Sequence, residues 1–272
     1  MAVDIRWSCA FAVLLATTVF GDRVRAEAAD GSAPRRMVLV ELFTSEGCSS
    51  CPPADAVLSE LVLRQPVAGV ELLALGEHVD YWDRLGWRDR FSSADHTTRQ
   101  SEYDAHVFHR HEVYTPQLVI DGQLERVGSD IRAVQRAVKE VAQAPKAAID
   151  VAVLRAHDRS LDVSVHVDVP PTLTLRESAD VFVAITEDNL VTEVRHGENG
   201  GRTLKHSAVV RSLTSVGTLS PSERTSSMNA SVPVASELKT ANLRIVSFLQ
   251  ERASRRIVGA GAASAHPRVD TR

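Results

Sequence analysis

The sequence is poor in cysteine, in aromatic side chains and in long apolar runs. Its 272 residues include three cysteines, and aromatic residues make up 5% of the chain. So few cysteines exclude a disulfide-dense scaffold. The fold must therefore rest on hydrophobic packing, for which a hydrophobic content of 44% is ordinary. A net charge of −4 without a long basic run gives no indication of a basic surface that would bind nucleic acid or anionic lipid.

The longest apolar run lies near the start of the chain. Residues 9–20 are apolar but too few to span a bilayer as a stable helix, and residues 24–26 offer small side chains at a cleavage position. We expect residues 1–26 to be a signal peptide, the mature protein to be periplasmic or secreted, and no stable membrane span to remain after cleavage. A membrane anchor or a flexible start is the alternative. Cleavage would leave two cysteines, Cys48 and Cys51, which can pair in an oxidising compartment.

The first regular segments predict a strand–helix–strand unit around these cysteines. Residues 37–44 read as a mostly buried strand, and residues 70–76 as a second one. Between them, apolar residues recur every three or four positions over 54–62, which predicts an amphipathic helix. This order predicts two parallel strands joined by a right-handed crossover.

The cysteine pair sits where the first strand ends and the helix begins. The free N–H groups and dipole of a helix N-terminus favour a thiolate, so Cys48 is the expected attacking thiol and Cys51 the resolving one. Pro52 and Pro53 fit the first helical turn, where their missing N–H groups have no partner to lose. Three alternatives remain: half of a zinc site, a permanent structural disulfide, or an ancestral pair no longer used.

Aromatic residues gather in one segment after the second strand. Six of the ten that follow residue 26 lie in residues 80–112, which we interpret as a helical insertion covering one end of the sheet. Within it, Ser92 with Asp95 resembles a helix N-cap, with the helix running to about residue 108. An Asp-Gly pair then predicts a hairpin over residues 117–127, and Ser129 is the expected cap of a last helix.

The second half of the chain is typical of strands. Residues 148–156 and 161–169 alternate apolar and polar side chains and predict a hairpin, with further strands over 181–186, 243–250 and 256–260. We therefore expect a smaller, antiparallel β-rich domain over residues 146–262. The glycine-rich segment 197–202 lacks the ending of a phosphate-binding loop. It is expected to pack against the first domain, with Glu198 and Arg202 at the contact.

Four motifs carry a resemblance to a known family. They are ELFTSEGCSSCPPAD (41–55), HVDYWDRLGWRD (78–89), YTPQLVIDG (114–122) and GENGGRTLKH (197–206). Together they resemble the secreted family catalogued as domain of unknown function 1223, and the order of elements resembles the thioredoxin superfamily. The resemblance implies export and an α/β thioredoxin-like domain over residues 35–145. It also implies that Pro116 is cis and that Thr115 and Pro116 lie against the cysteines, where the substrate chain docks. Gly76-Glu77 departs from the small or apolar residues expected there.

The function expected from these features is thiol–disulfide exchange without a cofactor. Partners would be exported proteins or small thiols, held through a mixed disulfide, together with an unidentified redox partner. His78 and Asp80 either tune the thiolate or move a proton, or else are a structural histidine and a helix cap. The aromatic side chains of Trp82, Trp87 and Tyr114 either bind substrate or belong to the core of the insertion.

Two other functions stay open. Cys48, Cys51 and His78 are a donor set suited to copper or zinc, and His106, His109 and His111 enrich the same region in histidine. The chain could instead be a non-catalytic binding module whose disulfide stiffens the fold.

Overall fold

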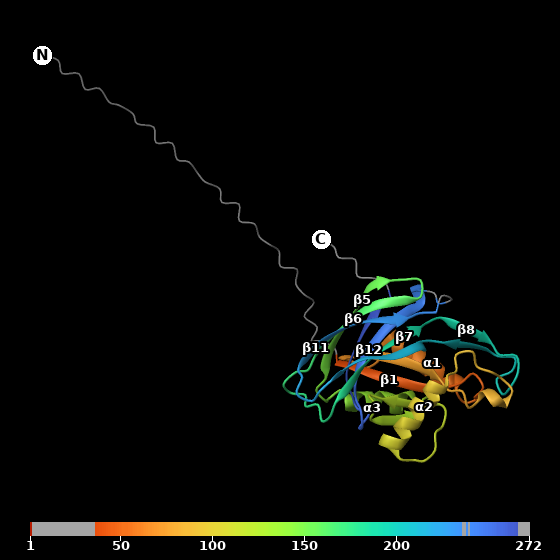
Figure 1. Cartoon of the computed structure of the whole chain (residues 1–272). Coiled ribbons are helices and arrows are strands. Elements are labelled where there is room, and N and C mark those ends of the chain that lie inside the picture. The colour runs from red at the N-terminus through yellow and green to blue at the C-terminus, as the bar shows by residue number, and fades with distance from the viewer. Residues whose placement is uncertain (2–35, 236–237, 239, 266–272) are drawn as a thin grey trace. The chain divides into compact units, whose positions relative to one another are not determined.

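The computed structural model shows a mixed α/β protein dominated by strands (Figure 1). It describes residues 1, 36–235, 238 and 240–265. The signal peptide expected over residues 1–26 lies outside this range except for Met1. Within the described residues, no helix has the length and apolar character needed to cross a membrane.

The strand–helix–strand unit is present as expected. Strands β1 (Arg36–Thr44) and β2 (Val70–His78) pair in parallel, and helix α1 (Pro52–Arg64) connects them. Both strands are buried along almost their whole length, because other elements cover both faces of the sheet here. This is why their sequences are continuous apolar runs.

The Asp-Gly hairpin prediction is confirmed. Strand β3 (Gln117–Ile120) pairs with β1 and with β4 (Leu124–Val127), antiparallel in both cases. Asp121 and Gly122 have positive φ angles of 47° and 65°, as a type I′ turn requires. A Cβ atom at position 122 would also approach the Arg255 carbonyl oxygen to 2.0 Å, so this turn has no room for a side chain.

Both expected helix caps are wrong by one residue. Ser93 has an extended backbone and accepts the N–H of Asp95, whereas the Ser92 hydroxyl donates to Asp83 instead. At the last helix the Asp130 carboxylate, not the Ser129 side chain, accepts the N–H of Ala133. A cap needs one particular backbone conformation, which neighbouring Ser and Asp residues can supply equally well. The helical elements are η1 (Asp83–Leu85), α2 (Ala94–Tyr103), the π-helical turn η2 (Asp104–Phe108) and α3 (Ile131–Val141).

The second half consists of strands, as expected, but it has more of them. Those over 190–193, 203–206, 209–219 and 225–233 were not predicted, because they are short or rich in Ser, Thr and Gly. The elements are β5 (Ala147–Ala156), β6 (Ser160–Asp168), β7 (Ala179–Glu187), β8 (Leu190–Glu193), β9 (Thr203–His206), β10 (Val209–Leu219), β11 (Thr225–Pro233), the turn η3 (Thr240–Asn242), β12 (Leu243–Glu251) and β13 (Ile257–Ser264).

The strands of both halves form one large sheet. Its order is β11-β6-β5-β13-β12-β7-β10-β2-β1-β3-β4, and β8 and β9 form a separate two-stranded sheet. The link between the halves is a parallel bridge from Val209 in β10 to Gly76 in β2. Strand β13 also pairs with β5 in parallel, so the second half is not purely antiparallel as predicted. The domain boundary expected near residue 146 stays a prediction.

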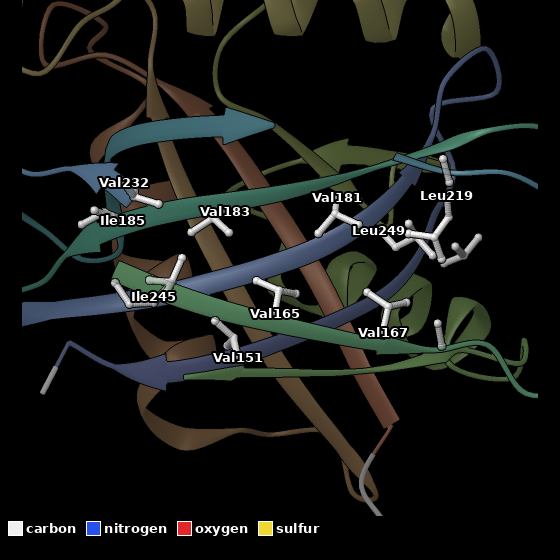
Figure 2. Packing of buried hydrophobic residues seen from close by; sticks show 14 of the residues in the cluster. Val151, Val165, Val167, Val181, Val183, Ile185, Leu219, Val232, Ile245 and Leu249 are labelled. Atoms are coloured by element: carbon white, nitrogen blue, oxygen red, sulfur yellow. The ribbon is translucent and has the colours of Figure 1, made fainter. Parts of the chain in front are cut away.

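Apolar clusters on both faces of the sheet stabilise this arrangement. Helices α1 and α3 pack on one face of β1 and β2, through residues such as Leu42 and Leu58. On the other face, Leu39 and Leu73 contact side chains from β12 and β13. The curved strands of the second half enclose their own core, rich in valine, which Figure 2 shows from close by. The carboxyl ends of β1 and β2 are thus held from both faces.

Candidate active site at the cysteine pair

The cysteine pair lies in the turn that joins β1 to α1. The Cys48 N–H donates to Ser45 and the Cys51 N–H donates to Cys48, both at 3.2 Å, and α1 begins directly after Cys51 with two prolines in its first turn. Both cysteines are free thiols without exposed surface, and their sulfur atoms lie near disulfide distance. The strand–helix junction predicted for the pair is confirmed.

Cys48 is surrounded by hydrogen-bond donors. The Cys51 thiol, the Ser50 hydroxyl at 3.2 Å and the Thr115 hydroxyl all reach its sulfur. These donors favour the thiolate, the Cys51 thiol most strongly, and outweigh burial, so the pKa of Cys48 falls to about 6. This is the electrostatic setting of an attacking thiol.

Cys51 has the opposite setting. Burial, the neighbouring Cys48 and the Asp55 carboxylate all raise the pKa of the Cys51 thiol, which is hydrogen-bonded to the Thr44 hydroxyl. Thr44 in turn donates to Asp55 Oδ1 at 2.9 Å. Cys51 therefore keeps its proton until a base removes it, as a resolving thiol must.

The alkylation rate of Cys48 with iodoacetamide is expected to follow this lowered pKa. The rate should rise with pH through a midpoint near 6 and level off above about pH 7, because roughly nine in ten Cys48 side chains are then thiolates. Peptide mass spectrometry of timed samples assigns the modification to Cys48. Cys51→Ala removes the strongest donor, and its midpoint should move upwards. A wild-type midpoint near 8.5, that of an ordinary thiol, contradicts the prediction.

Thr115 lies beside Cys48, and the Thr115–Pro116 peptide bond has the cis form that the resemblance implied. The Thr115 hydroxyl contacts Cys48 and accepts a hydrogen bond from Trp82 Nε1 at 2.9 Å. The Trp82 Cβ atom also packs against Gly47, where a side chain would come within 3.2 Å of it. Trp82 is therefore at the site, half-buried over the cysteine turn.

The segment after β8 reaches the same turn from the second half of the chain. The buried Asn199 amide donates to the carbonyl oxygens of Glu46 and Cys48, both at 2.9 Å. Glu198 accepts the Ser49 N–H at 3.0 Å. The predicted contact of this segment with the first half is confirmed for Glu198, whereas Arg202 donates to Asn199 within the segment itself.

Behind the cysteine turn lies a group of five buried side chains that we call the acid–imidazole cluster: Glu46, Asp55, His78, Asp89 and His206. His78 Nδ1 lies 2.6 Å from Asp89 Oδ2. His206 Nε2 lies 3.3 Å from Glu46 Oε1, and His206 Nδ1 lies 3.8 Å from Asp55 Oδ2. All five are less than a tenth exposed. Buried carboxylates and imidazoles at such distances can exchange protons.

The charges in this cluster depend on one another. The two imidazole rings meet edge to face, 4.9 Å apart, and Phe91 packs against both. Burial lowers the pKa of His78, but the adjacent Asp89 carboxylate outweighs it and the net shift is upwards. Burial raises the pKa of Asp89, but the His78 imidazolium outweighs it and the net shift is downwards. His78 and Asp89 therefore each favour the charged form of the other, and they form an ion pair.

Other residues predicted for the site lie elsewhere. Asp80 accepts a hydrogen bond from Thr97 of α2, at 2.6 Å. The Tyr114 hydroxyl donates to Glu125. Trp87 contacts the cluster rather than the cysteines, because its Nε1 donates to Glu46 at 2.8 Å.

Cys48, Cys51 and His78, suggested as ligands for copper or zinc, do not come together as a metal site. Among the residues that the structure describes, no group of three or more His, Cys, Asp or Glu side chains could hold a metal ion. His78 Nδ1 is taken by Asp89, while His106, His109 and His111 are exposed.

The residues that sequence reasoning missed all lie inside the four motifs. Thr44, Glu46 and Asp55 belong to the first, Asp89 ends the second, and Asn199 and His206 belong to the fourth. The signal that could have found them is that polar residues alternate with apolar ones in segments expected to be buried. Which of these side chains meet depends on the chain path, which no local pattern reports.

Fold and site together define a mixed α/β protein with a buried cysteine pair at a strand–helix junction. The chain belongs to the family described as "Protein of unknown function (DUF1223)", whose model matches residues 39–250. The resemblance seen in the four motifs is thus confirmed. No curated protein matches the chain significantly.

Two solved structures are similar to this chain over most of its length. Protein AGR_C_4864 from Agrobacterium tumefaciens is 26% identical, with a TM-score of 0.67 over 89% of this chain and 100% of its own. HBP35 of Porphyromonas gingivalis is 13% identical, with a TM-score of 0.60 over 85% of this chain and 76% of its own. The second likeness shows the fold alone.

Proposed function

We propose that this protein is an exported thiol–disulfide oxidoreductase with a thioredoxin-like first half. Its substrates are exported proteins or small thiols, and a separate redox partner returns the cysteine pair to its starting redox state. The thioredoxin-like assignment rests on the parallel strand–helix–strand unit with the cysteines at its junction, and on the cis Thr115–Pro116 bond beside them. Export rests on the signal-like residues 1–26.

The observation that carries the proposal is the asymmetry of the two thiols. The pKa of Cys48 is lowered to about 6 by three hydrogen-bond donors, whereas that of Cys51 is raised by burial. The Cys48 thiolate attacks one sulfur of a substrate disulfide, and the other substrate sulfur leaves. Cys51 then attacks the Cys48 sulfur, which releases the second substrate thiol and closes the Cys48–Cys51 disulfide. The reverse sequence oxidises a substrate dithiol.

Access to Cys48 depends on movement of the residues that cover it. Neither sulfur is exposed, and Trp82, Glu198 and Asn199 bind the surrounding turn. A substrate disulfide reaches Cys48 only when this cover opens. The same burial favours a second candidate function, a non-catalytic binding module in which the pair is a structural disulfide that reductants do not reach.

The reduction potential of the pair tests the proposal against this second candidate. The protein is equilibrated in glutathione or dithiothreitol buffers, and the oxidised fraction is read by thiol trapping and mass spectrometry. An oxidoreductase is expected to give a reversible two-electron potential between about −120 and −270 mV. A potential below about −300 mV, or a pair that never equilibrates, refutes the proposal in favour of the structural disulfide. The Cys48→Ser, Cys51→Ser double variant supplies the baseline.

A further inference from the structure

His206 is a buried histidine whose ring nitrogens are uncommitted. It ends β9 in the second half of the chain, 158 residues after Cys48, and is 3% exposed. Neither ring nitrogen makes a hydrogen bond to another described residue, and the same holds for Glu46 Oε1, which faces Nε2 at 3.3 Å. Buried polar atoms are almost always hydrogen-bonded, so this gap needs an explanation.

The ring lies at the end of a path of polar atoms that starts at Cys51. The Cys51 thiol is hydrogen-bonded to the Thr44 hydroxyl, which donates to Asp55 Oδ1 at 2.9 Å. The other carboxylate oxygen of Asp55 faces His206 Nδ1 at 3.8 Å. On its far side, His206 faces Glu46. The path thus joins the resolving thiol to an imidazole through one hydroxyl and one carboxylate.

His206 suits proton transfer better than its neighbour His78. The rings are 4.9 Å apart, but His78 Nδ1 is held by Asp89 at 2.6 Å. The titratable groups that face His206 are Glu46 from the turn after β1, Asp55 from α1 and His78 from β2. Two acids and one imidazole thus face a ring whose nitrogens make no hydrogen bond to another described residue.

We propose that His206 relays the proton of Cys51, through Asp55 and Thr44, when the mixed disulfide is resolved. This inference rests on the thiol–disulfide exchange proposed above. His206 touches no reacting atom and is therefore a positioning residue, supplied by the second half of the chain to the cysteines of the first. Burial raises the pKa of Asp55, which makes its carboxylate a stronger proton acceptor.

The step balances without a further reactant. In the mixed disulfide, the Cys51 thiol gives its proton to the Thr44 hydroxyl as that hydroxyl passes its own to Asp55, and Asp55 passes it to His206. The Cys51 thiolate forms the bond to the Cys48 sulfur, and the bond from Cys48 to the substrate sulfur breaks. The leaving substrate thiolate takes up a proton from solvent. The substrate disulfide has gained two electrons and the cysteine pair has lost them.

Single-turnover kinetics with glutathione disulfide tests the relay. Reduced protein is mixed with the probe, quenched with acid, and analysed by intact-mass spectrometry, which separates free protein, glutathione adduct and closed disulfide. His206→Gln is expected to leave adduct formation within about twofold of wild type and to slow resolution at least about tenfold, which is less than the roughly hundredfold or more that a general base in direct contact contributes. The ratio of the wild-type resolution rate to that of His206→Gln should also change with pH, because glutamine cannot take up a proton.

Three further variants make the outcome decisive. Asp55→Asn interrupts the path between Thr44 and the ring and should give the same slow resolution; if His206→Gln does not fold, resolution of Asp55→Asn at the wild-type rate still overturns the relay. His96→Gln is the matched control, because His96 is a buried histidine of α2 that bonds to the His78 carbonyl and lies off the path. It should resolve like wild type. Glu46→Gln is expected to shift the pH profile of resolution, because its carboxylate faces Nε2.

Asp55 also lines a surface groove of about 400 Å³ with Ser59 and Lys205, which offers its proton a direct exit to solvent. If Asp55→Asn resolves slowly and His206→Gln resolves like wild type, this exit is used and the relay is overturned. Adduct that forms and resolves equally fast in every variant also overturns the relay but leaves the exchange reaction standing. Wild-type protein that forms neither adduct nor disulfide refutes the proposed function itself.

Discussion

Cys48→Ser is expected to abolish thiol–disulfide exchange, whereas Cys51→Ser is expected to halt it halfway, at a stable mixed disulfide. A serine hydroxyl is not ionised near neutral pH and cannot replace a thiolate nucleophile, so the first variant should lose at least about a thousandfold in rate. The second keeps the attacking thiol with its Ser50 and Thr115 donors. It lacks only the group that displaces the substrate.

Intact-mass spectrometry after mixing with glutathione disulfide separates the two expectations. Cys51→Ser should accumulate one glutathione adduct that dithiothreitol removes, and Cys48→Ser should accumulate none. Wild-type protein should pass through the adduct to the closed disulfide. If Cys51 were the nucleophile, the adduct would appear on Cys48→Ser instead, and the assignment of roles would be reversed. Adduct on both variants at equal rates would mean that neither thiol is activated.

Arg99→Met is expected to cost about 3–5 kcal/mol of unfolding free energy, the usual result of removing one partner from a buried ion pair. Arg99 of α2 is buried between two strand carboxylates: its Nη2 lies 2.6 Å from Glu41 and its Nε lies 3.5 Å from Glu77. It also donates to Tyr103 and Gln250, at 3.0 Å each. Without the guanidinium, two buried acids face each other unpaired.

Urea unfolding at pH 7, followed by circular dichroism, measures this loss. Glu77→Gln is the matched control in the same network and should cost much less, because the amide keeps the shape of the side chain and leaves no additional buried charge unpaired. Burial and the neighbouring Glu41 carboxylate raise the pKa of Glu77 well above its usual value, and Arg99 offsets only part of this. An Arg99→Met protein as stable as wild type would show that the network does not hold α2 on the sheet.

The pH dependence of stability gives the network a second signature. Because the folded-state pKa of Glu77 exceeds the unfolded one, the folded protein binds the proton more tightly. The contribution of Glu77 is fully present below the unfolded pKa of about 4.3 and declines as pH rises from there through the folded pKa. Glu77→Gln has no proton to lose, so its stability should fall less steeply over that range than that of wild type.

The network also accounts for Glu77, which departs from the small or apolar residues expected at that position. Glu77 interrupts an apolar strand, and the structure places it beside Arg99. Residues His96, Arg99, Gln100 and Tyr103 of α2 face inwards, so this helix attaches by ion pairs and hydrogen bonds rather than by an apolar stripe. The sequence of this segment predicted a helix that covers one end of the sheet, but it did not predict which charged side chains would pair with each other.

Local sequence determined much of this protein. The apolar runs of β1 and β2, the periodic stripe of α1 and the Asp-Gly turn each depend on neighbouring residues only, and each prediction is confirmed. The position of Cys48 and Cys51 at a strand–helix junction followed from the same local patterns. The sequence therefore sufficed to locate the reactive pair and the helix that begins behind it.

The tertiary structure alone decided what surrounds that pair. The parallel bridge from Val209 to Gly76 joins the two halves into one sheet, and through it Asn199 and His206 arrive at the cysteine turn from about 150 residues away. Periodicity reports which face of a strand is buried, but not which strand lies beside it. Contacts between distant residues depend on the path of the whole chain. The sequence thus determined the position of the thiols. The fold determined that the Asn199 amide binds the carbonyl oxygens of their turn and that the His206 imidazole lies buried behind it.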